Sequence, residues 1–301
     1  MSDALFTTCD LAGTELTNRV VMAPMTRCRA IGNTPNDLMA TYYAQRAGAG
    51  MIITEGTSPS PNGLGYARIP GAYSKQQTAD WRKVTEAVHE KGGRIFLQIM
   101  HTGRVSHPDN LPEGAEVLAP SEVALDETGM WVDEAGDMLP MPAPKAMTSE
   151  QVESTIEEYV TTARNAIEAG FDGVEIHGAN GYLVEQFIHP HTNRRLDDWG
   201  GSVDARLRFP LEVARRVVDA IGADQVGFRI SPYGVFNEMP HYDEMDETYT
   251  KLATRLGEMG LAYLHLLDHS SQGAPEVPTA IKRTVRDAFG GTMILCGGFD
   301  A

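Results

Sequence analysis

The sequence predicts an α/β fold, specifically a TIM (β/α)8 barrel. Short apolar or β-branched runs alternate along the chain with amphipathic, helix-like segments, an order typical of a parallel sheet. Several of the runs are apolar throughout, as expected of strands that are covered on both faces. Polar side chains recur just after many of the runs. The ends of parallel strands converge on one mouth when the sheet closes into a barrel, so this recurrence favours a barrel over an open sheet.

The expected elements follow one another in strand-helix order. The strands are expected at residues 19–23, 49–54, 94–99, 173–176, 225–230, 262–267 and 292–296. Helices are expected at residues 76–90, 149–169, 203–221 and 246–259. The glycines expected to end them are Gly92, Gly170, Gly222 and Gly260. Together these elements predict repeated βα units of a parallel sheet.

Two segments fall outside the repeating pattern. Residues 5–16, with Gly13 at a turn, predict a small hairpin that plugs the end opposite the mouth. Residues 107–147 are rich in proline, glycine and acids, and predict a hairpin flap over the mouth. The sequence ends at Ala301, after the last expected strand. We therefore expect residues 1–301 to be a single barrel domain that lacks its last βα unit.

Composition narrows the class of protein. The 25 lysines and arginines against 41 acids give a net charge of −16, which excludes a nucleic-acid surface and disfavours an anionic membrane. The 3 cysteines have no disulfide or metal-ligand spacing and fit a reducing compartment. No signal peptide or membrane-length apolar stretch is present, so a cytoplasmic location is expected. The charge on the surface helices fits a monomer and a dimer equally.

The segment from His177 to Tyr182, HGANGY, carries the strongest chemical signal. It follows an apolar strand directly and presents three different hydrogen-bonding side chains. His177 and Asn180 can donate to one substrate oxygen and stabilise the enolate-like charge that develops when a hydride adds to a conjugated alkene. Tyr182 can then supply the proton. The alternative is a structural core histidine followed by a loop-forming Asn-Gly pair.

Other strand ends suggest a planar, electron-accepting ring. Thr26 offers a hydroxyl to a flavin carbonyl, and the Gln98 amide can read the edge of a pyrimidine-like ring. Arg229 brings a fixed positive charge that would stabilise a reduced flavin. The alternative for Arg229 is a structural salt bridge with Glu55 or Glu175.

A glycine pair follows the last expected strand. Gly297 and Gly298 offer bare backbone, which suits the approach of a phosphate near the seventh and eighth strands of a barrel. The chain has neither a G-x-G-x-x-G motif after a strand nor a P-loop lysine motif. A Rossmann unit and a nucleotide triphosphatase are therefore not supported.

Together these segments resemble the old yellow enzyme family over essentially the whole chain. Thr26, where another branch has cysteine, favours the classical branch, which includes N-ethylmaleimide and pentaerythritol tetranitrate reductases. The resemblance rests on NRVVMAPMTRCRA, ITEGTSP, GYARIPG, LQIMHTGRVSH, GFDGVEIHGANGYLVEQFIHP, TNRRLDDWGGSVDARLRF and VGFRISP.

The resemblance implies an FMN-dependent ene-reductase. FMN would bind noncovalently across the barrel mouth, with NADPH or NADH as reductant. An enone, enal, nitroalkene or maleimide would then be reduced in the same pocket, in a ping-pong cycle. The residues that match the family's flavin contacts are Pro24, Thr26, Gly56, Gln98 and Arg229, with Gly297 and Gly298 near the phosphate. The residues that match its substrate site are His177, Asn180, Tyr66 and Met100, with Tyr182 as the proton donor.

The chain departs from the family pattern at a few positions. Gly56 stands where many relatives have alanine, and Met100 where several have tryptophan. The Gly-Arg pair that grips the flavin phosphate after the eighth strand of the family is not in this sequence.

Two other functions are compatible with single features of the sequence. The His189-Pro190-His191 spacing suggests a divalent-metal site, and with it a metal-dependent barrel hydrolase. The other alternative is a truncated barrel without flavin that acts as a binding module.

Overall fold

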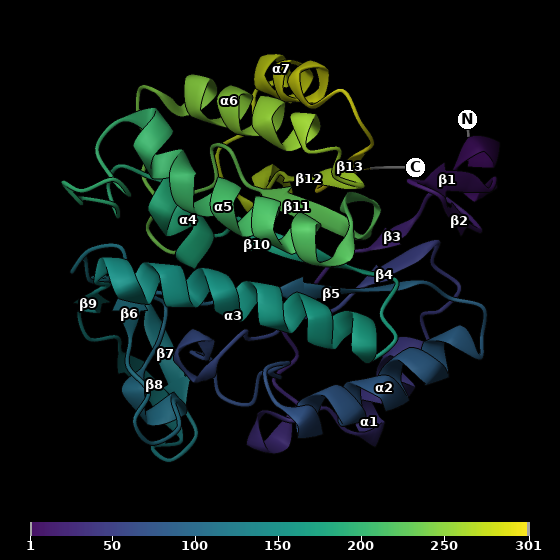
Figure 1. Cartoon of the computed structure of the whole chain (residues 1–301), viewed down its shortest axis with the longest axis horizontal. Helices are drawn as coiled ribbons and strands as arrows, with labels where there is room; N and C mark the ends of the chain where they lie inside the picture. The colour runs from purple at the N-terminus through teal and green to yellow at the C-terminus, as the bar shows by residue number, and fades with distance from the viewer. Residues whose placement is uncertain (1, 300–301) are drawn as a thin grey trace.

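The computed structural model describes residues 2–299. Its strands form an inner layer, and the helices lie outside them (Figure 1). All neighbouring pairs in the central sheet are parallel, in the order β13-β12-β11-β10-β5-β4-β3. The seven strands are β3 (Val21–Met22), β4 (Met51–Ile53), β5 (Ile95–Ile99), β10 (Gly173–Gly178), β11 (Val226–Ile230), β12 (Tyr263–Leu267) and β13 (Met293–Cys296). Each expected strand is therefore confirmed, with its bounds shifted by two residues or fewer.

The sheet curves into a nearly closed barrel. Within residues 2–299 the two outer strands, β3 and β13, are not paired with each other. A cleft of about 480 Å³ lies between them, lined on one side by Val21 and Ala23 and on the other by Ile294 and Cys296. The barrel is thus continuous along every strand junction except this one in the described chain.

The helices surround the barrel and alternate with its strands along the chain. They are α1 (Asp37–Ala44), α2 (Lys75–His89), α3 (Ser149–Glu168), α4 (Leu183–Ile188), α5 (Val203–Ile221), α6 (Met245–Glu258) and α7 (Thr279–Phe289). Shorter 3-10 turns are η1 (Ser2–Phe6), η2 (Ile31–Asn33), η3 (Pro61–Gly63), η4 (Pro108–Asn110), η5 (Ala223–Gln225) and η6 (Ser270–Gln272). None of the helices in residues 2–299 has the length and apolar character needed to cross a membrane.

Local sequence explains where the long helices begin. Ser74 and Thr148 each form a capping box, in which the side chain accepts from the third helical N–H and the third residue bonds back. The Ser202 hydroxyl accepts from Ala205 N–H at the start of α5, and Gly222 follows its last residue. These caps satisfy N–H groups that the helices leave without internal partners.

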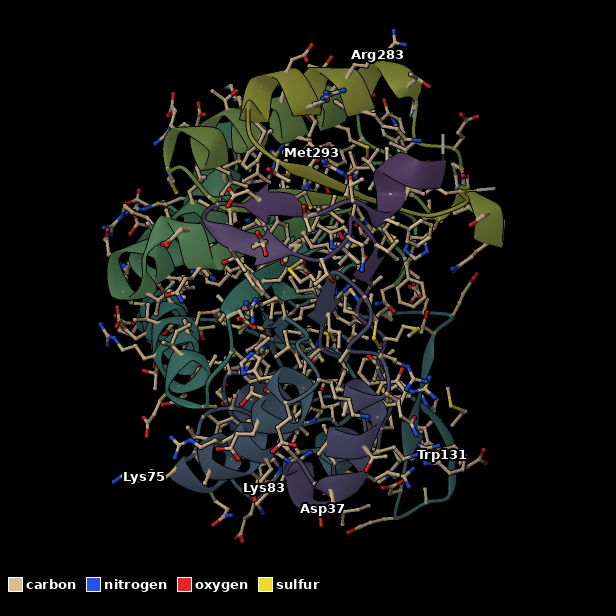
Figure 2. The ribbon with its side chains drawn as sticks, turned by 90° about the vertical axis from the view of Figure 1, so that its right-hand side faces the viewer. Asp37, Lys75, Lys83, Trp131, Arg283 and Met293 are labelled. Atoms are coloured by element: carbon tan, nitrogen blue, oxygen red, sulfur yellow. The ribbon has the colours of Figure 1, made fainter. Side chains whose placement is uncertain are left out.

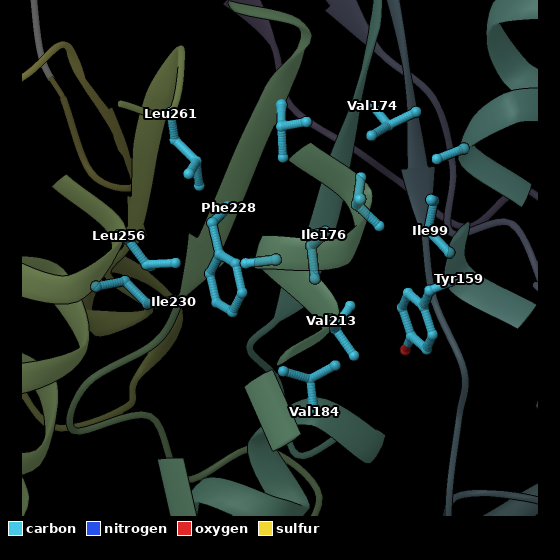
Figure 3. Packing of buried hydrophobic residues seen from close by; sticks show 14 of the residues in the cluster. Ile99, Tyr159, Val174, Ile176, Val184, Val213, Phe228, Ile230, Leu256 and Leu261 are labelled. Carbon is cyan, nitrogen blue, oxygen red and sulfur yellow. The ribbon is translucent and has the colours of Figure 1, made fainter. Parts of the chain in front are cut away.

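The main core lies between the sheet and the helices (Figure 3). Ile176 and Phe228 point outward from neighbouring strands and are fully buried. Val213 of α5 and Tyr159 of α3 cover them from the helical layer. Burial of each such side chain contributes about 1.5–3 kcal/mol, so this layer holds the helices on the barrel.

A hairpin closes the end of the barrel opposite the mouth. Its antiparallel strands are β1 (Cys9–Leu11) and β2 (Thr14–Leu16). Leu11 and Leu16 are buried in a cluster with Phe96 and Tyr263 of the barrel strands. Figure 2 shows the hairpin beside the strand that carries Met293. The predicted plug is therefore confirmed.

The expected flap lies at the other end of the barrel (Figure 1). Its strands are β6 (Leu118–Ala119), β7 (Gly129–Val132), β8 (Asp137–Pro140) and β9 (Lys145–Ala146). The β7 and β8 strands pair as an antiparallel hairpin, and β6 pairs with β9 at its base. Leu125, Met130 and Met141 of the flap pack in one buried cluster with Met100 and Tyr182. The flap therefore covers the carboxyl ends of the strands.

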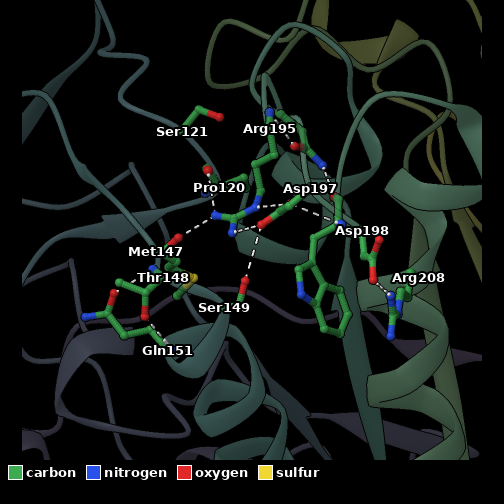
Figure 4. A network of polar contacts seen from close by, with 12 residues as sticks. Pro120, Ser121, Met147, Thr148, Ser149, Gln151, Arg195, Asp197, Asp198 and Arg208 are labelled. Atoms are coloured by element: carbon green, nitrogen blue, oxygen red, sulfur yellow. Dashed lines mark hydrogen bonds and ion pairs between the residues drawn. The ribbon is translucent and has the colours of Figure 1, made fainter.

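Arginines fasten this flap at two levels. The buried Arg104 guanidinium donates to Ala124 O at 3.1 Å in the flap and to Asn237 O at 2.8 Å in the loop after β11. At the base, Arg195 donates to the carbonyls of Pro120 and Met147 (Figure 4). Both ends of the flap are thus tied to loops of the barrel.

Packing inside the barrel generates a stability prediction. An ideal Cβ on Gly227 would lie 2.1 Å from Cζ of the fully buried Tyr263 ring. Gly227→Ala is expected to lower the free energy of unfolding by about 1–3 kcal/mol, because the ring has no free space to move into. Urea denaturation measures this change. The control is Gly48→Ala, where a Cβ meets nothing within 4 Å; an equal loss in both variants would contradict the packing argument.

Candidate active site

Polar side chains from neighbouring strands meet at the mouth, as the sequence predicts for a barrel. Gln98 on β5 is paired in register with Glu175 on β10. One row nearer the mouth, His177 is paired with Arg229 on β11, which is paired in turn with His265 on β12. All five side chains are buried.

Glu175 is the centre of a buried hydrogen-bond network. Its Oε1 accepts from Gln98 Nε2 at 2.7 Å, and its Oε2 lies 2.8 Å from His265 Nδ1. Burial opposes ionisation of this carboxyl, but His265, Arg229 and Gln98 outweigh it and hold its pKa below the usual range. Burial lowers the pKa of His265, so we assign a neutral ring that donates from Nδ1.

The Arg229 guanidinium forms no ion pair with a carboxylate in the described part of the chain. Among residues 2–299, neither Glu55 nor Glu175 forms an ion pair with it, and its Nε is buried without a hydrogen-bond partner. Its Nη2 lies 3.7 Å from Cys296 Sγ. The alternative of a structural salt bridge for Arg229 is therefore absent from the described chain.

His177 is neutral and sits against a tyrosine. Burial, and then the positive charge of Arg229, hold the pKa of His177 well below its usual value. Its ring centroid lies 5.1 Å from that of Tyr182. Nδ1 of His177 is buried and has no partner within residues 2–299. The side chain thus carries one N–H and keeps unused hydrogen-bonding capacity.

The turn after His177 has an unusual backbone. Asn180 and Gly181 both have positive φ, 61° and 70°. Asn180 N–H donates to Ser231 Oγ at 2.9 Å, and Asn180 O accepts from Asn237 Nδ2 at 2.7 Å. Gly181 N–H donates to Glu185 Oε2 at 2.6 Å. These bonds hold a left-handed conformation that asparagine adopts more readily than other residues with a side chain.

Tyr182 and Tyr66 join their hydroxyls at the mouth. The two oxygens are 2.9 Å apart. Burial, followed by the nearby Tyr66, raises the pKa of Tyr182 well above its usual value. Tyr182 is therefore protonated at neutral pH.

Gly56 and Met100 are in direct contact below the flap. An ideal Cβ on Gly56 would lie 2.5 Å from Met100 Sδ. Positions 56 and 100 are therefore one packing unit. On the neighbouring strand end, Pro24 is half-buried and Thr26 is exposed.

Gly297 and Gly298 lie at the end of β13. Their φ values are 121° and 61°, and a Cβ on Gly297 would sit 1.9 Å from Asp268 O. With Lys282 they line a cleft of about 240 Å³. Only glycine fits at position 297, so this part of the cleft wall is bare backbone.

His189 of the His189-Pro190-His191 segment forms hydrogen bonds that hold the local backbone. His189 Nε2 lies 2.6 Å from Pro240 O, and His189 Nδ1 accepts from His191 N–H at 3.1 Å. Residues 2–299 contain no group of three or more histidine, cysteine or acidic side chains placed to hold a metal. The metal-hydrolase alternative is not favoured.

Several residues that support the site were not predicted from the sequence. They are Glu185, Ser231, Asn237 and His269, and each contacts the Asn180-Gly181 turn. His269, for example, is 89 residues from Asn180. Of these, Glu185 alone is close to the turn in sequence. It lies four residues after Gly181, and this short spacing is a signal that the sequence itself offers.

Known proteins share this fold and these segments. The NADH:flavin oxidoreductase / NADH oxidase family matches residues 4–301. Rice 12-oxophytodienoate reductase 7 is 40% identical over 98% of this chain and 79% of its own length. A probable flavin mononucleotide-dependent alkene reductase of Leishmania infantum is 44% identical over 85% of this chain and 71% of its own.

Solved structures agree with the sequence comparison. Morphinone reductase superposes with a TM-score of 0.95, at 40% identity, over 99% of this chain and 80% of its own. A further structure of morphinone reductase, in complex with tetrahydroNAD, has a TM-score of 0.93, 40% identity, and coverage of 99% and 81%. Barrel and mouth thus define a flavin-dependent oxidoreductase that uses a nicotinamide. The chain belongs to the NADH:flavin oxidoreductase / NADH oxidase family, that of the old yellow enzyme.

The buried Glu185 predicts a pH dependence of stability. Burial raises its pKa to about 7, although Tyr249, Gly181 and Ser231 donate to it. Because the folded pKa lies above the usual 4.5, folding takes up a proton between these values, and the stabilisation by Glu185 is lost as pH rises from about 4.5 to 7. Glu185→Gln stays neutral, so its stability relative to the unaltered chain is expected to increase by about 1–3 kcal/mol between pH 5 and 8.

Urea denaturation at several pH values measures this difference. The control is Glu86→Gln, an exposed position on α2. A Glu185→Gln difference that stays constant with pH would show that this carboxyl does not titrate on folding.

Proposed function

We propose that the chain is an FMN-dependent ene-reductase that reduces carbon–carbon double bonds activated by a carbonyl or nitro group. The observation that carries this proposal is the HGANGY turn. It presents a neutral histidine, an asparagine in the left-handed conformation and a protonated tyrosine together at the barrel mouth. An enone, enal, nitroalkene or maleimide has the matching features, an acceptor oxygen and an alkene that needs a hydride and a proton.

The unused polar groups of the mouth fit FMN. The unpartnered Arg229 Nε and His177 Nδ1 are buried, and such groups cost free energy unless a ligand satisfies them. Arg229 also offers positive charge to a ring that accepts electrons. Bound FMN would take a hydride from the nicotinamide and pass it to the alkene. Pro24, Thr26, Gly56 and Gln98 are proposed to contact the ring.

The bare backbone at Gly297 and Gly298 supports a place for the FMN phosphate. A peptide chain without side chains lets N–H groups approach an anion closely. The positive charge of Lys282, which lines the same cleft, adds to this, although Asp268 pairs with it at 2.6 Å. No motif for a covalent link to flavin is needed in this arrangement.

His177 and Asn180 are proposed to bind the activating oxygen of the substrate. Both would donate to it, and donors fixed in place before the reaction stabilise negative charge as it develops there. Tyr66 and Met100, in the cluster under the flap, would line the rest of the pocket. This clamp would also set the alkene in one orientation.

Tyr182 is proposed to protonate the α-carbon. Its high pKa keeps the proton on the hydroxyl until carbanion character develops at the neighbouring carbon. The proton would come from the side opposite the hydride, so the net addition would be trans. The Tyr66 hydroxyl, at 2.9 Å, supports the position of the donor.

The nicotinamide is proposed to use the same pocket before the alkene enters, in a ping-pong cycle. A tetrahydroNAD complex is known for morphinone reductase, a structural neighbour. Both NADPH and NADH fit this proposal. The three free cysteines of the described chain fit a cytoplasmic setting.

The cycle is tested by anaerobic absorption spectroscopy. Protein loaded with FMN is mixed with NADPH, or NADH in parallel, and then with 2-cyclohexenone. We expect the flavin band to bleach with the nicotinamide and to return with the enone. A band that never forms on addition of FMN, or that stays bleached with every alkene class, would contradict the proposed function.

Removing the proton donor separates the two halves of the cycle. Tyr182→Phe is expected to slow alkene reduction roughly 100-fold, the size typical of a positioned acid. Bleaching by the nicotinamide should change little, since it needs no proton from this hydroxyl. Stopped-flow spectroscopy of each half-reaction measures both. Tyr233→Phe, whose hydroxyl bonds Asp246, is the control, and equal slowing of both halves in Tyr182→Phe would rule out the proposed role.

A further inference from the structure

His269 reaches Asn180 from a different part of the barrel. It stands just after β12, and its Nε2 lies 3.0 Å from Asn180 Oδ1. The imidazole stacks parallel to Phe236 of the preceding loop, with ring centroids 6.0 Å apart and an interplanar angle of 0°. His269 thus contacts the asparagine side chain directly, and Phe236 packs against His269.

The rest of Asn180 is already fixed. Its N–H and its C=O are held by Ser231 and Asn237. The remaining freedom is the side-chain amide, which can point either its oxygen or its nitrogen in a given direction. In the structure His269 Nε2 lies 3.0 Å from Asn180 Oδ1, and its Nδ1 lies 3.4 Å from Gln272 Oε1. We assign the proton to Nε2, which faces the nearer oxygen; Nε2–H then donates to Oδ1, and Nδ2 is the end left for a ligand.

We propose that His269 is a positioning residue that fixes the Asn180 amide with its N–H toward the substrate oxygen. This inference rests on the proposed function, because it concerns the oxygen clamp of that site. Without His269 the amide is free to flip and present Oδ1, which repels a carbonyl or nitro oxygen. His269 thereby selects ligands whose activating group is purely a hydrogen-bond acceptor.

Two kinds of ligand respond differently to this arrangement. A ketone oxygen only accepts hydrogen bonds, so a flipped Asn180 amide cannot bind it. A carboxamide such as that of nicotinamide has both a donor and an acceptor, and it can bind either orientation of Asn180. Loss of His269 should therefore weaken ketone binding more than carboxamide binding, which a general disturbance of the site would not do.

A double-mutant cycle tests the coupling. The variants are His269→Ala, Asn180→Ala and the pair, each loaded with FMN, with His269→Gln to restore a side-chain N–H donor. The dissociation constant of the complex with cyclohexanone, a ketone without a conjugated carbon–carbon double bond, should rise about tenfold in His269→Ala, the size of one hydrogen bond. In the Asn180→Ala background the same change should have less than about a twofold effect, because residues that act through each other are non-additive.

Nitrogen NMR of the histidine side chains gives a readout without turnover. We expect His269 to carry its proton on Nε2 and the Nε2 resonance to move in Asn180→Ala. His241→Ala is the matched control and should leave ligand binding unchanged, because His241 is exposed and its ring is tilted against Tyr233, with centroids 5.4 Å apart. Far-UV circular dichroism checks that each variant is folded.

Specific outcomes overturn the inference. Additive effects of His269→Ala and Asn180→Ala on the dissociation constant would contradict the inference. So would an equal loss of affinity for the ketone and for the carboxamide in His269→Ala, or an Nε2 resonance that does not shift in Asn180→Ala. A partial recovery of cyclohexanone affinity in His269→Gln, relative to His269→Ala, supports the inference. If the unaltered chain reduces no alkene, the proposed function fails by itself, and the NMR experiment still decides whether His269 holds Asn180.

Discussion

The chemistry of the mouth depends on how one buried carboxylate is satisfied. Glu175 is fully buried inside the barrel, where an isolated charge would be costly. Gln98 occupies one of its oxygens and His265 the other. Within residues 2–299 the neighbouring Arg229 forms no ion pair with this carboxylate, and its positive charge still helps to hold the pKa of Glu175 low. The arginine Nε has no hydrogen-bond partner in the part of the chain that the structure describes, and the positive charge of Arg229 helps to keep His177 neutral.

The architecture was predictable because local signals agree with the global fold. The expected range for α5 matches the structure at both ends, since Ser202 caps one and Gly222 follows the other. By contrast α4, Leu183–Ile188, is buried on all sides, and so it lacks the polar face by which an amphipathic helix is recognised. Turn residues predicted the hairpin and the flap. Nothing in the sequence pattern indicated that Arg104 and Arg195 fasten the flap.

The candidate site was predictable only in part for a related reason. His177 and Tyr182 follow a strand directly, and strand ends in a barrel share one mouth. The residues that give them their properties come from distant loops: Ser231 and Asn237 follow β11, and His269 follows β12. Side-chain contacts between loops depend on loop conformation, which hydrophobic periodicity does not encode. The same holds for the pKa of Glu185, which is set by burial rather than by neighbours in sequence.

The contact between Gly56 and Met100 has a consequence for how this pocket evolves. A methyl group at position 56 needs the space that the Met100 thioether now fills. Substitutions at the two positions are therefore epistatic: the effect of either depends on which residue occupies the other. A side chain at position 56 is therefore accommodated only if the side chain at position 100 moves or becomes smaller. Directed evolution of this pocket gains most from libraries that randomise the two codons together.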